Sequence, residues 1–184
     1  MMTKSLYAVA VFLIAIVIVA DAECEVGPVK DVHFEMDKFL GKWCWIYHEP
    51  NDVEKNIGCI KDSFQQSNTL TFFTNTSFYN ESTKEIQSAI YTVPHWNSTS
   101  FTQDPDSDGA IWTSTFFFVS LDYKKYAALK YCLKGWDKPV TLIGFRRCDP
   151  DEHTIKEAKD SLDANGGRSD TLLKYKYCDC LKDL

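Results

Sequence analysis

Between residues 42 and 147 the chain consists of short segments rich in Thr, Phe, Tyr, Ile and Val, separated by clusters of Asn, Asp, Gly and Pro. Such segments favour β-strands, and most connections are short enough for hairpins, so sequential strands should pair antiparallel. We expect eight strands at 42–48, 59–66, 69–78, 85–93, 98–103, 110–119, 124–132 and 139–147, and a further short one at 171–177. The pattern predicts an all-β domain.

Helical character appears once, after the eighth strand. Asp149-Pro150-Asp151-Glu152 offers an N-cap, a proline at the first helical position and a glutamate at the third. Ile155, Ala158 and Leu162 then recur on one face, and Asn165-Gly166-Gly167 marks the end. This order suits an eight-stranded antiparallel up-and-down barrel, with one C-terminal α-helix packed outside and room inside for one small ligand. A two-sheet sandwich is the alternative, because strand number alone does not separate the two.

The first 22 residues have the form of a secretory signal peptide. Lys4 supplies a positive start, residues 7–20 are almost wholly apolar, and Ala20-Asp21-Ala22 is a small-x-small cleavage site. The apolar run is shorter than the ~20 residues that span a bilayer, which disfavours a membrane anchor. We therefore expect residues 1–22 to be removed and residues 23–184 to form one secreted domain without stable membrane insertion.

The charged residues disfavour a nucleic-acid partner and a metal. Acidic residues outnumber basic ones by 26 to 20, and the charges are scattered singly rather than gathered into the basic stripe that nucleic acid requires. Asp104, Asp106 and Asp108 have the spacing of a calcium loop but lack its glycine and its distal glutamate. We interpret them as a solvated loop.

Seven cysteines remain in the expected secreted chain, at positions 24, 44, 59, 132, 148, 178 and 180. In an oxidising compartment most of them should form disulfides. Because the number is odd, one cysteine has no partner within the chain. It could be a buried free thiol, form a disulfide with a second chain or hold a covalently attached group. A zinc site is disfavoured, because one residue separates Cys178 from Cys180 and no second pair answers them.

Three sequons for N-glycosylation lie close together in the chain. Asn75, Asn80 and Asn97 each precede a serine or threonine by two residues. Behind a signal peptide, this indicates a glycoprotein if the host is a eukaryote.

The segment GKWCWIYHEP, residues 41–50, carries three aromatic side chains at alternate positions. On a strand, Trp43, Trp45 and Tyr47 point to one side, and the residues between them and His48 point to the other. Taken alone, the segment favours a filled core.

This segment and several later ones resemble conserved motifs of the lipocalin family. Gly41-Lys42-Trp43 is similar to the first-strand G-x-W motif of the family. Residues 48–55, followed by Cys59, resemble the lid loop and cysteine of the apolipoprotein D and insect bilin-binding branch. The resemblance covers nearly all of the expected mature chain.

Two further segments carry the resemblance. Residues 120–127, which contain Asp122 and Tyr123, are similar to the T-D-Y turn of the family, although Leu121 stands where threonine is usual. Residues 142–146 resemble the last barrel strand, which carries the family's arginine, here Arg146.

The resemblance implies a set of disulfides. The bridges would be Cys24 with Cys132, and Cys59 with Cys178 or Cys180. Cys44 and Cys148 are additional to this set, and they lie on the first and last expected strands, which are neighbours in a closed barrel. A third bridge between them is a geometric hypothesis that requires a short Cα separation.

The resemblance also divides the barrel interior. Trp43 would close the narrow end, stacked against the guanidinium of Arg146. Alternation and the family register predict that ligand-binding side chains lie further along the inward faces, namely Trp45, Tyr47, Phe72, Trp112, Ser114, Phe116, Phe118, Leu129 and Tyr131. We expect an apolar, aromatic cavity whose polar groups are Ser, Thr and Tyr hydroxyls.

The function that this resemblance implies is that of a secreted carrier of one small hydrophobic ligand, with no required cofactor. A biliverdin-like pigment is the first ligand expected, because the lid-loop pattern resembles the bilin-binding branch, and a retinoid, carotenoid, fatty acid or sterol follows. No catalytic activity is expected. Cys44 should face outward without a histidine beside it, and no catalytic triad or carboxylate pair stands at a readable spacing.

Three alternatives differ in ligand or in mode of action. Haem carriage, as in some salivary lipocalins, needs an axial ligand in the barrel, but His33 precedes the barrel, His48 should point outward, His95 lies in an expected turn and His153 lies on the helix. A salivary-type carrier of biogenic amines is the second. The third is a protein inhibitor that acts through its outer surface.

Overall fold

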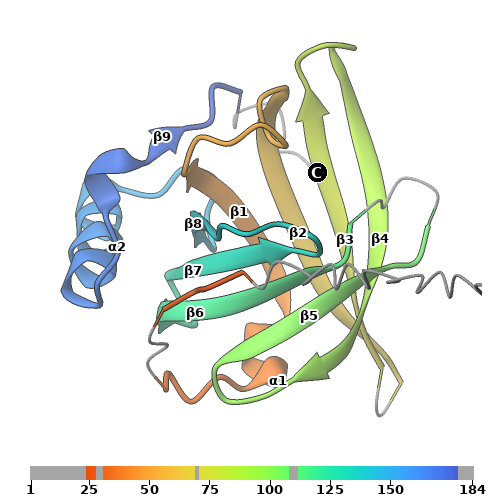
Figure 1. Cartoon of the computed structure of the whole chain (residues 1–184), viewed down its shortest axis with the longest axis horizontal. Helices are drawn as coiled ribbons and strands as arrows, with labels where there is room; N and C mark the ends of the chain where they lie inside the picture. The colour runs from red at the N-terminus through yellow and green to blue at the C-terminus, as the bar shows by residue number, and fades with distance from the viewer. Residues whose placement is uncertain (1–23, 28–30, 69–70, 108–111, 178–184) are drawn as a thin grey trace, which may run out of the picture.

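The computed structural model describes residues 24–27, 31–68, 71–107 and 112–177 (Figure 1). The expected signal peptide, residues 1–22, lies outside the described residues, as do Cys178 and Cys180. Their predicted roles therefore stay predictions.

Eight antiparallel strands close into a barrel in chain order. They are β1 (Gly41–His48), β2 (Ile57–Asn68), β3 (Thr71–Asn80), β4 (Glu85–Trp96), β5 (Ser100–Pro105), β6 (Ser114–Asp122), β7 (Tyr126–Leu133) and β8 (Val140–Phe145). Each strand pairs with its neighbour in sequence, and β1 pairs with both β2 and β8. The predicted barrel is confirmed, and this closure excludes an open two-sheet sandwich.

Short elements flank the barrel strands. The helix α1 (Met36–Phe39), which the sequence did not predict, precedes β1. After the barrel come α2 (Glu152–Ala164), the 3₁₀ helix η1 (Ser169–Thr171) and β9 (Leu173–Lys174). The strand β9 pairs with the end of β1, so the sheet gains a ninth member outside the barrel. β4 continues through His95, which the sequence placed in a turn.

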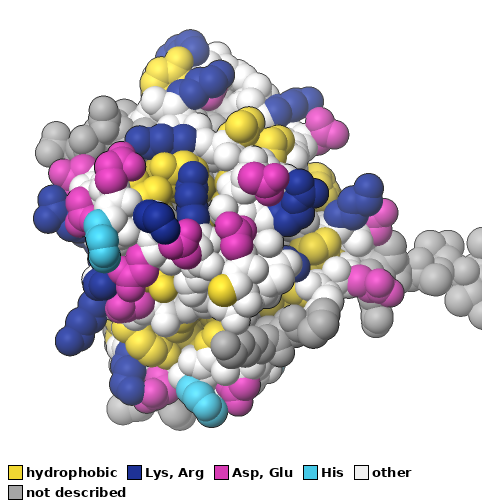
Figure 2. All heavy atoms as spheres, turned by 90° about the vertical axis from the view of Figure 1, so that its left-hand side faces the viewer, with side chains coloured by type: hydrophobic (Ala, Val, Ile, Leu, Met, Phe, Trp, Pro, Cys, Tyr) yellow, Lys and Arg dark blue, Asp and Glu magenta, His cyan; other side chains and the backbone are white. Residues whose placement is uncertain are grey.

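The helix α2 packs on the outside of the barrel, to the left in Figure 1. The predicted face of Ile155, Ala158 and Leu162 is buried. The N-cap is Asp151, whose side chain accepts a hydrogen bond from the Thr154 N–H at 2.8 Å. Figure 2 shows acidic and basic side chains interspersed over the face that carries α2, with no basic stripe. In the described part of the chain, no helix is both long and apolar enough to cross a membrane.

Aromatic rings and one arginine fill the narrow end of the barrel. The Arg146 guanidinium lies 3.9 Å from the centroid of the Trp43 ring, which is the stack that the resemblance implied. Arg146 also donates to the backbone oxygens of Leu40 at 2.8 Å and Tyr123 at 2.8 Å. Gly41 has a φ of +95°, and a Cβ there would lie 3.3 Å from this guanidinium. These contacts tie the segment before β1 to the segment after β8.

The turn between β6 and β7 supports the same end. Asp122 accepts a hydrogen bond from the Lys124 N–H at 2.8 Å, and the Tyr123 hydroxyl receives the Glu35 N–H at 2.6 Å. Burial raises the pKa of that hydroxyl. The turn therefore holds the segment that precedes α1 across the barrel bottom.

Two disulfides join distant parts of the chain. Cys24 pairs with Cys132 on β7, as the resemblance implied. Cys44 on β1 pairs with Cys148 after β8 at a Cα separation of 5.1 Å, so the geometric hypothesis is confirmed. Cys59 is buried, and its expected partners lie outside the described residues. For the five described cysteines a disulfide between two chains is not supported, because four of them pair within the chain and Cys59 is buried.

Candidate functional site

A cavity of about 400 Å³ lies in the wide half of the barrel. Five of the side chains expected to bind ligand line it: Trp45, Trp112, Ser114, Phe116 and Tyr131. Further apolar side chains line the cavity as well, namely Val53, Ile57, Ile60, Phe78, Leu133 and Leu142. The cavity is therefore aromatic and aliphatic over much of its wall. None of the four histidines, all of which the structure describes, lines it.

Three other expected side chains point into the barrel but lie too deep to line the cavity. Phe118 is fully buried in the closed end, with its ring 4.3 Å from that of Phe34. Leu129 lies opposite Phe118 on β7 and is also fully buried. Phe72 packs edge-to-face on Trp96 with 4.9 Å between the ring centroids. Alternation gave the direction of these side chains but not their height in the barrel.

Tyr47 lies outside the barrel, contrary to the expectation. The register between β1 and β8 shifts between Trp45 and Tyr47, which is a β-bulge. The bulge reverses the alternation, so the Tyr47 ring faces α2, where the Lys159 Nζ lies 4.3 Å from its centroid. Phe145 contacts the same ring at 6.4 Å.

The same bulge turns His48 back towards the cavity rim. Its Nδ1 lies 3.1 Å from the Oε2 of Glu54, and its ring stacks on Tyr175 with 4.0 Å between the centroids. The expectation that His48 points outward was therefore wrong. No particular residue type marks the extra residue of this bulge, so the sequence of the segment did not reveal it.

The cavity wall contains a buried acid that the sequence analysis missed. Asp62 on β2 is 5% exposed and lines the cavity. Its Oδ2 accepts a hydrogen bond from Trp45 Nε1 at 2.7 Å, and its Oδ1 accepts one from Thr76 Oγ1 at 2.6 Å. Burial raises the pKa of this carboxyl to about 6, although both hydrogen bonds act to lower it. The pattern Ile60-x-Asp62-x-Phe64 was the available signal, because alternation gives all three the same side.

A second acid enters the cavity from the loop between β1 and β2, residues 49–56, which we call the lid loop. Glu54 is 4% exposed, and its Oε1 accepts a hydrogen bond from the Tyr131 hydroxyl at 2.8 Å. Its Oε2 accepts one from Asn51 Nδ2 at 2.8 Å. Burial, followed by the charge of Glu54, raises the pKa of Tyr131. Glu49 pins the start of the loop by accepting from the Thr141 N–H at 3.2 Å.

The remaining polar side chains of the wall are amides, hydroxyls and a phenol: Asn56, Thr76, Asn80, Gln87, Tyr91 and Gln103. Gln103 donates to the Thr74 hydroxyl at 2.8 Å. The wall is thus more polar than expected. Among its described lining residues no basic side chain faces Asp62, whereas Glu54 has His48 Nδ1 3.1 Å from its Oε2. Within the described ranges, no group of three His, Cys, Asp or Glu side chains could hold a metal ion.

The three sequon asparagines lie at three levels of the barrel. Asn75 is exposed on β3, Asn80 lines the cavity, and Asn97 is exposed in the turn between β4 and β5. Their glycosylation stays a prediction.

No family model matches the chain, and no curated protein matches it. Solved structures match its fold. The major allergen Per a 4 from cockroaches is 22% identical, with a TM-score of 0.73 over 87% of this chain and 99% of that chain. The tryptamine complex of the amine-binding protein of Rhodnius prolixus is 18% identical, with a TM-score of 0.66 over 83% of this chain and 85% of that one. Insecticyanin from the tobacco hornworm Manduca sexta is 12% identical, with a TM-score of 0.69 over 88% and 89%.

Proposed function

Because this chain has the lipocalin fold, we propose that it is a secreted carrier that binds a small organic amine in the barrel cavity and does no chemistry on it. The ammonium of the ligand would lie against Asp62, and its aromatic or aliphatic body would lie against the rings above the closed end. The observation that carries this proposal is the burial of Asp62 in the cavity wall without a basic partner among the described residues that line the cavity.

A cationic ligand satisfies what the fold leaves incomplete. Each carboxylate oxygen of Asp62 accepts one hydrogen bond from an uncharged donor, so each retains acceptor capacity. An ammonium at this position would restore the charged form and lower the raised pKa. Transfer of the apolar body of the ligand from water adds roughly 25 cal/mol per Å² of buried surface.

Aromatic rings favour the same class of ligand. Trp45, Trp112 and Phe116 line the cavity, and their faces attract both a cation and a flat ring. The amine-binding protein of Rhodnius prolixus, which has a similar fold, is known in complex with tryptamine. Tryptamine joins an indole to an ammonium and is therefore a suitable first probe.

The negative charge of the cavity wall disfavours the other ligand classes that the sequence suggested. A bilin or a fatty acid carries carboxylates, which would lie near Asp62 and Glu54 and be repelled. An uncharged retinoid or sterol would bury Asp62 without giving it a partner, which costs free energy. The biliverdin-like pigment that the lid loop suggested is therefore not our leading candidate.

The test is a calorimetric titration with tryptamine and with indole-3-propionate, which replaces the ammonium by a carboxylate. We expect tryptamine alone to bind, and Asp62→Asn to weaken its affinity by at least about thirtyfold, because truncating one partner of a buried charge pair is costly. Asp106→Asn is the matched control, since Asp106 is exposed and does not line the cavity. Tighter binding of the acid, or unchanged affinity in Asp62→Asn, would refute the amine proposal.

The affinity should also depend on pH through Asp62. Below pH 6 the carboxyl takes up a proton, so the affinity for tryptamine should fall about tenfold per pH unit. Asp62→Asn should remove this dependence.

A further inference from the structure

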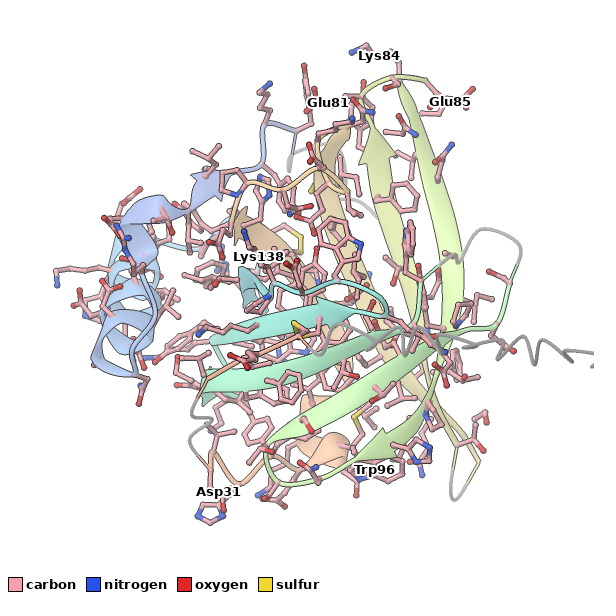
Figure 3. All side chains as sticks on the ribbon, viewed as in Figure 1. Asp31, Glu81, Lys84, Glu85, Trp96 and Lys138 are labelled. Carbon is pink, nitrogen blue, oxygen red and sulfur yellow. A yellow bond between two sulfur atoms is a disulfide. The ribbon has the colours of Figure 1, made fainter. Side chains whose placement is uncertain are left out.

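The sequon at Asn80 lies where a glycan would affect the ligand. Asn80 is the last residue of β3, and its side chain lines the cavity. The tight turn to β4 follows it, and the labelled Glu81, Lys84 and Glu85 mark that turn at the top of Figure 3. The lid loop lies at this end of the barrel, and α1 lies at the other (Figure 1).

Hydrogen bonds fix the direction of the Asn80 side chain. Its Oδ1 accepts from the N–H of Ser82 at 2.9 Å and from that of Thr83 at 3.3 Å, as in an Asx-turn. With Oδ1 held by the turn, Nδ2 points to the Oε1 of Gln87 at 3.3 Å. Gln87 also lines the cavity. A sugar attached to Nδ2 would therefore begin at the cavity rim.

The lid loop ends beside the same asparagine. Ile57, which follows the lid loop and lines the cavity, pairs with Asn80 across β2 and β3. The backbone oxygen of Asn56 accepts a hydrogen bond from the Glu81 N–H at 2.7 Å. A glycan on Asn80 would thus lie beside the backbone with which the lid loop ends.

The other two sequons lie elsewhere. Asn97 has the same kind of turn, because its Oδ1 accepts from the N–H of Thr99 at 2.8 Å. That turn lies at the closed end, where the Ser98 oxygen accepts from the N–H of Phe34, and the neighbouring Trp96 is labelled at the bottom of Figure 3. Asn75 lies on the outer face of β3, opposite Ile90. These two sites are internal controls for Asn80.

We propose that Asn80 carries an N-glycan whose first sugars form part of the cavity entrance and slow the entry and exit of ligand. The inference rests on the proposed carrier function. In the modification, Asn80 Nδ2 forms a bond to the anomeric carbon of a lipid-pyrophosphate-linked oligosaccharide, the bond from that carbon to the pyrophosphate oxygen breaks, and Nδ2 loses one proton. The remaining N–H can keep the hydrogen bond to Gln87.

The test compares full-length chains secreted from insect cells and from the bacterial periplasm. Ser82→Ala removes the sequon and leaves Asn80 in place, whereas Ser82→Thr retains it. Thr99→Ala removes the sequon of Asn97 at the closed end. Glycopeptide masses report which asparagines are modified, and stopped-flow fluorescence reports the binding and release of N-phenyl-1-naphthylamine, an uncharged probe that does not depend on Asp62.

In the insect-cell protein, we expect Ser82→Ala to raise the association and dissociation rate constants together by about threefold to tenfold, with a smaller change in affinity, because a gate acts on both rates. Ser82→Thr and Thr99→Ala should match the unaltered chain. In the bacterial protein, Ser82→Ala should have no effect.

An unmodified Asn80 in the insect-cell protein would overturn the inference, and so would equal rates with and without the glycan. A probe that binds neither form would leave the carrier function to be decided by the tryptamine titration, because an uncharged ligand gives Asp62 no partner. In that case, faster amide hydrogen exchange of residues 53–57 in insect-cell Ser82→Ala, which lacks the Asn80 glycan, than in the unaltered insect-cell chain would still support the glycan at the entrance. Equal exchange would overturn it.

Discussion

The two ends of the barrel treat charge in opposite ways. At the closed end, the Arg146 guanidinium donates to backbone oxygens and stacks on Trp43, so the fold itself completes its environment. At the wide end, Asp62 is buried with two uncharged donors and no basic side chain among the cavity-lining residues. The closed end therefore contributes to the stability of the fold. At the wide end, burial disfavours the charged form of Asp62, and the proposed ammonium would stabilise that form.

The largest effect should come from the closed end. Trp43→Ala should lower the free energy of unfolding by about 3–5 kcal/mol, because Trp43 is fully buried and its removal leaves a cavity under Arg146. Trp112→Ala is the matched control, because Trp112 lines the cavity and is 39% exposed, and it should cost less than about 1 kcal/mol. Urea unfolding of both variants measures the difference. Equal losses would mean that the two ends do not divide the roles in this way.

A smaller effect, of opposite sign, should come from Asp62. Its pKa is raised from 3.8 to about 6, so the folded state holds the proton more tightly than the unfolded state does. The stability of the ligand-free protein should therefore fall as pH rises from about 4 to about 6, and Asp62→Asn should restore about 1–3 kcal/mol at pH 7. Unfolding free energies at pH 4, 5, 6 and 7 measure this. A loss of stability at pH 7 would mean that the bonds from Trp45 and Thr76 outweigh the cost of burying the charge.

The smallest effect tests the bulge in β1, which sets the boundary between cavity wall and outer surface. Phe116→Ala should weaken tryptamine binding by about tenfold, because Phe116 lines the cavity and contributes apolar contact. Tyr47→Ala should change the affinity by less than about twofold, because Tyr47 faces α2. Calorimetric titration of both variants with tryptamine measures the two losses of affinity. A larger loss in Tyr47→Ala than in Phe116→Ala would place Tyr47 inside the barrel.

The sequence predicted the fold well because hairpin-sized connections and alternating strands leave few architectures. The helix face of Ile155, Ala158 and Leu162 and the pair Cys44–Cys148 followed from periodicity and from barrel closure. The helix face depends on the spacing of apolar residues, and the disulfide depends on which strands are neighbours. Both can be read directly from the sequence.

The site was less predictable because it depends on depth, on bulges and on interior polarity. Phe118 and Leu129 have the expected direction but belong to the closed end. Tyr47 was misplaced because a single bulge inverted the alternation after Trp45. Asp62 was missed because acids in strands usually face water, although its neighbours Ile60 and Phe64 share its side.

The two disulfides also determine how the molecule would carry a mechanical load. The bridges Cys24–Cys132 and Cys44–Cys148 span 108 and 104 residues, and the spans overlap. If residues 24 and 148 were pulled apart, the tension would pass through the sulfur atoms and the short stretches at 24–44 and 132–148. The strands from β2 to β6 lie in the slack segment between Cys44 and Cys132. Most of the cavity wall would therefore bear no force.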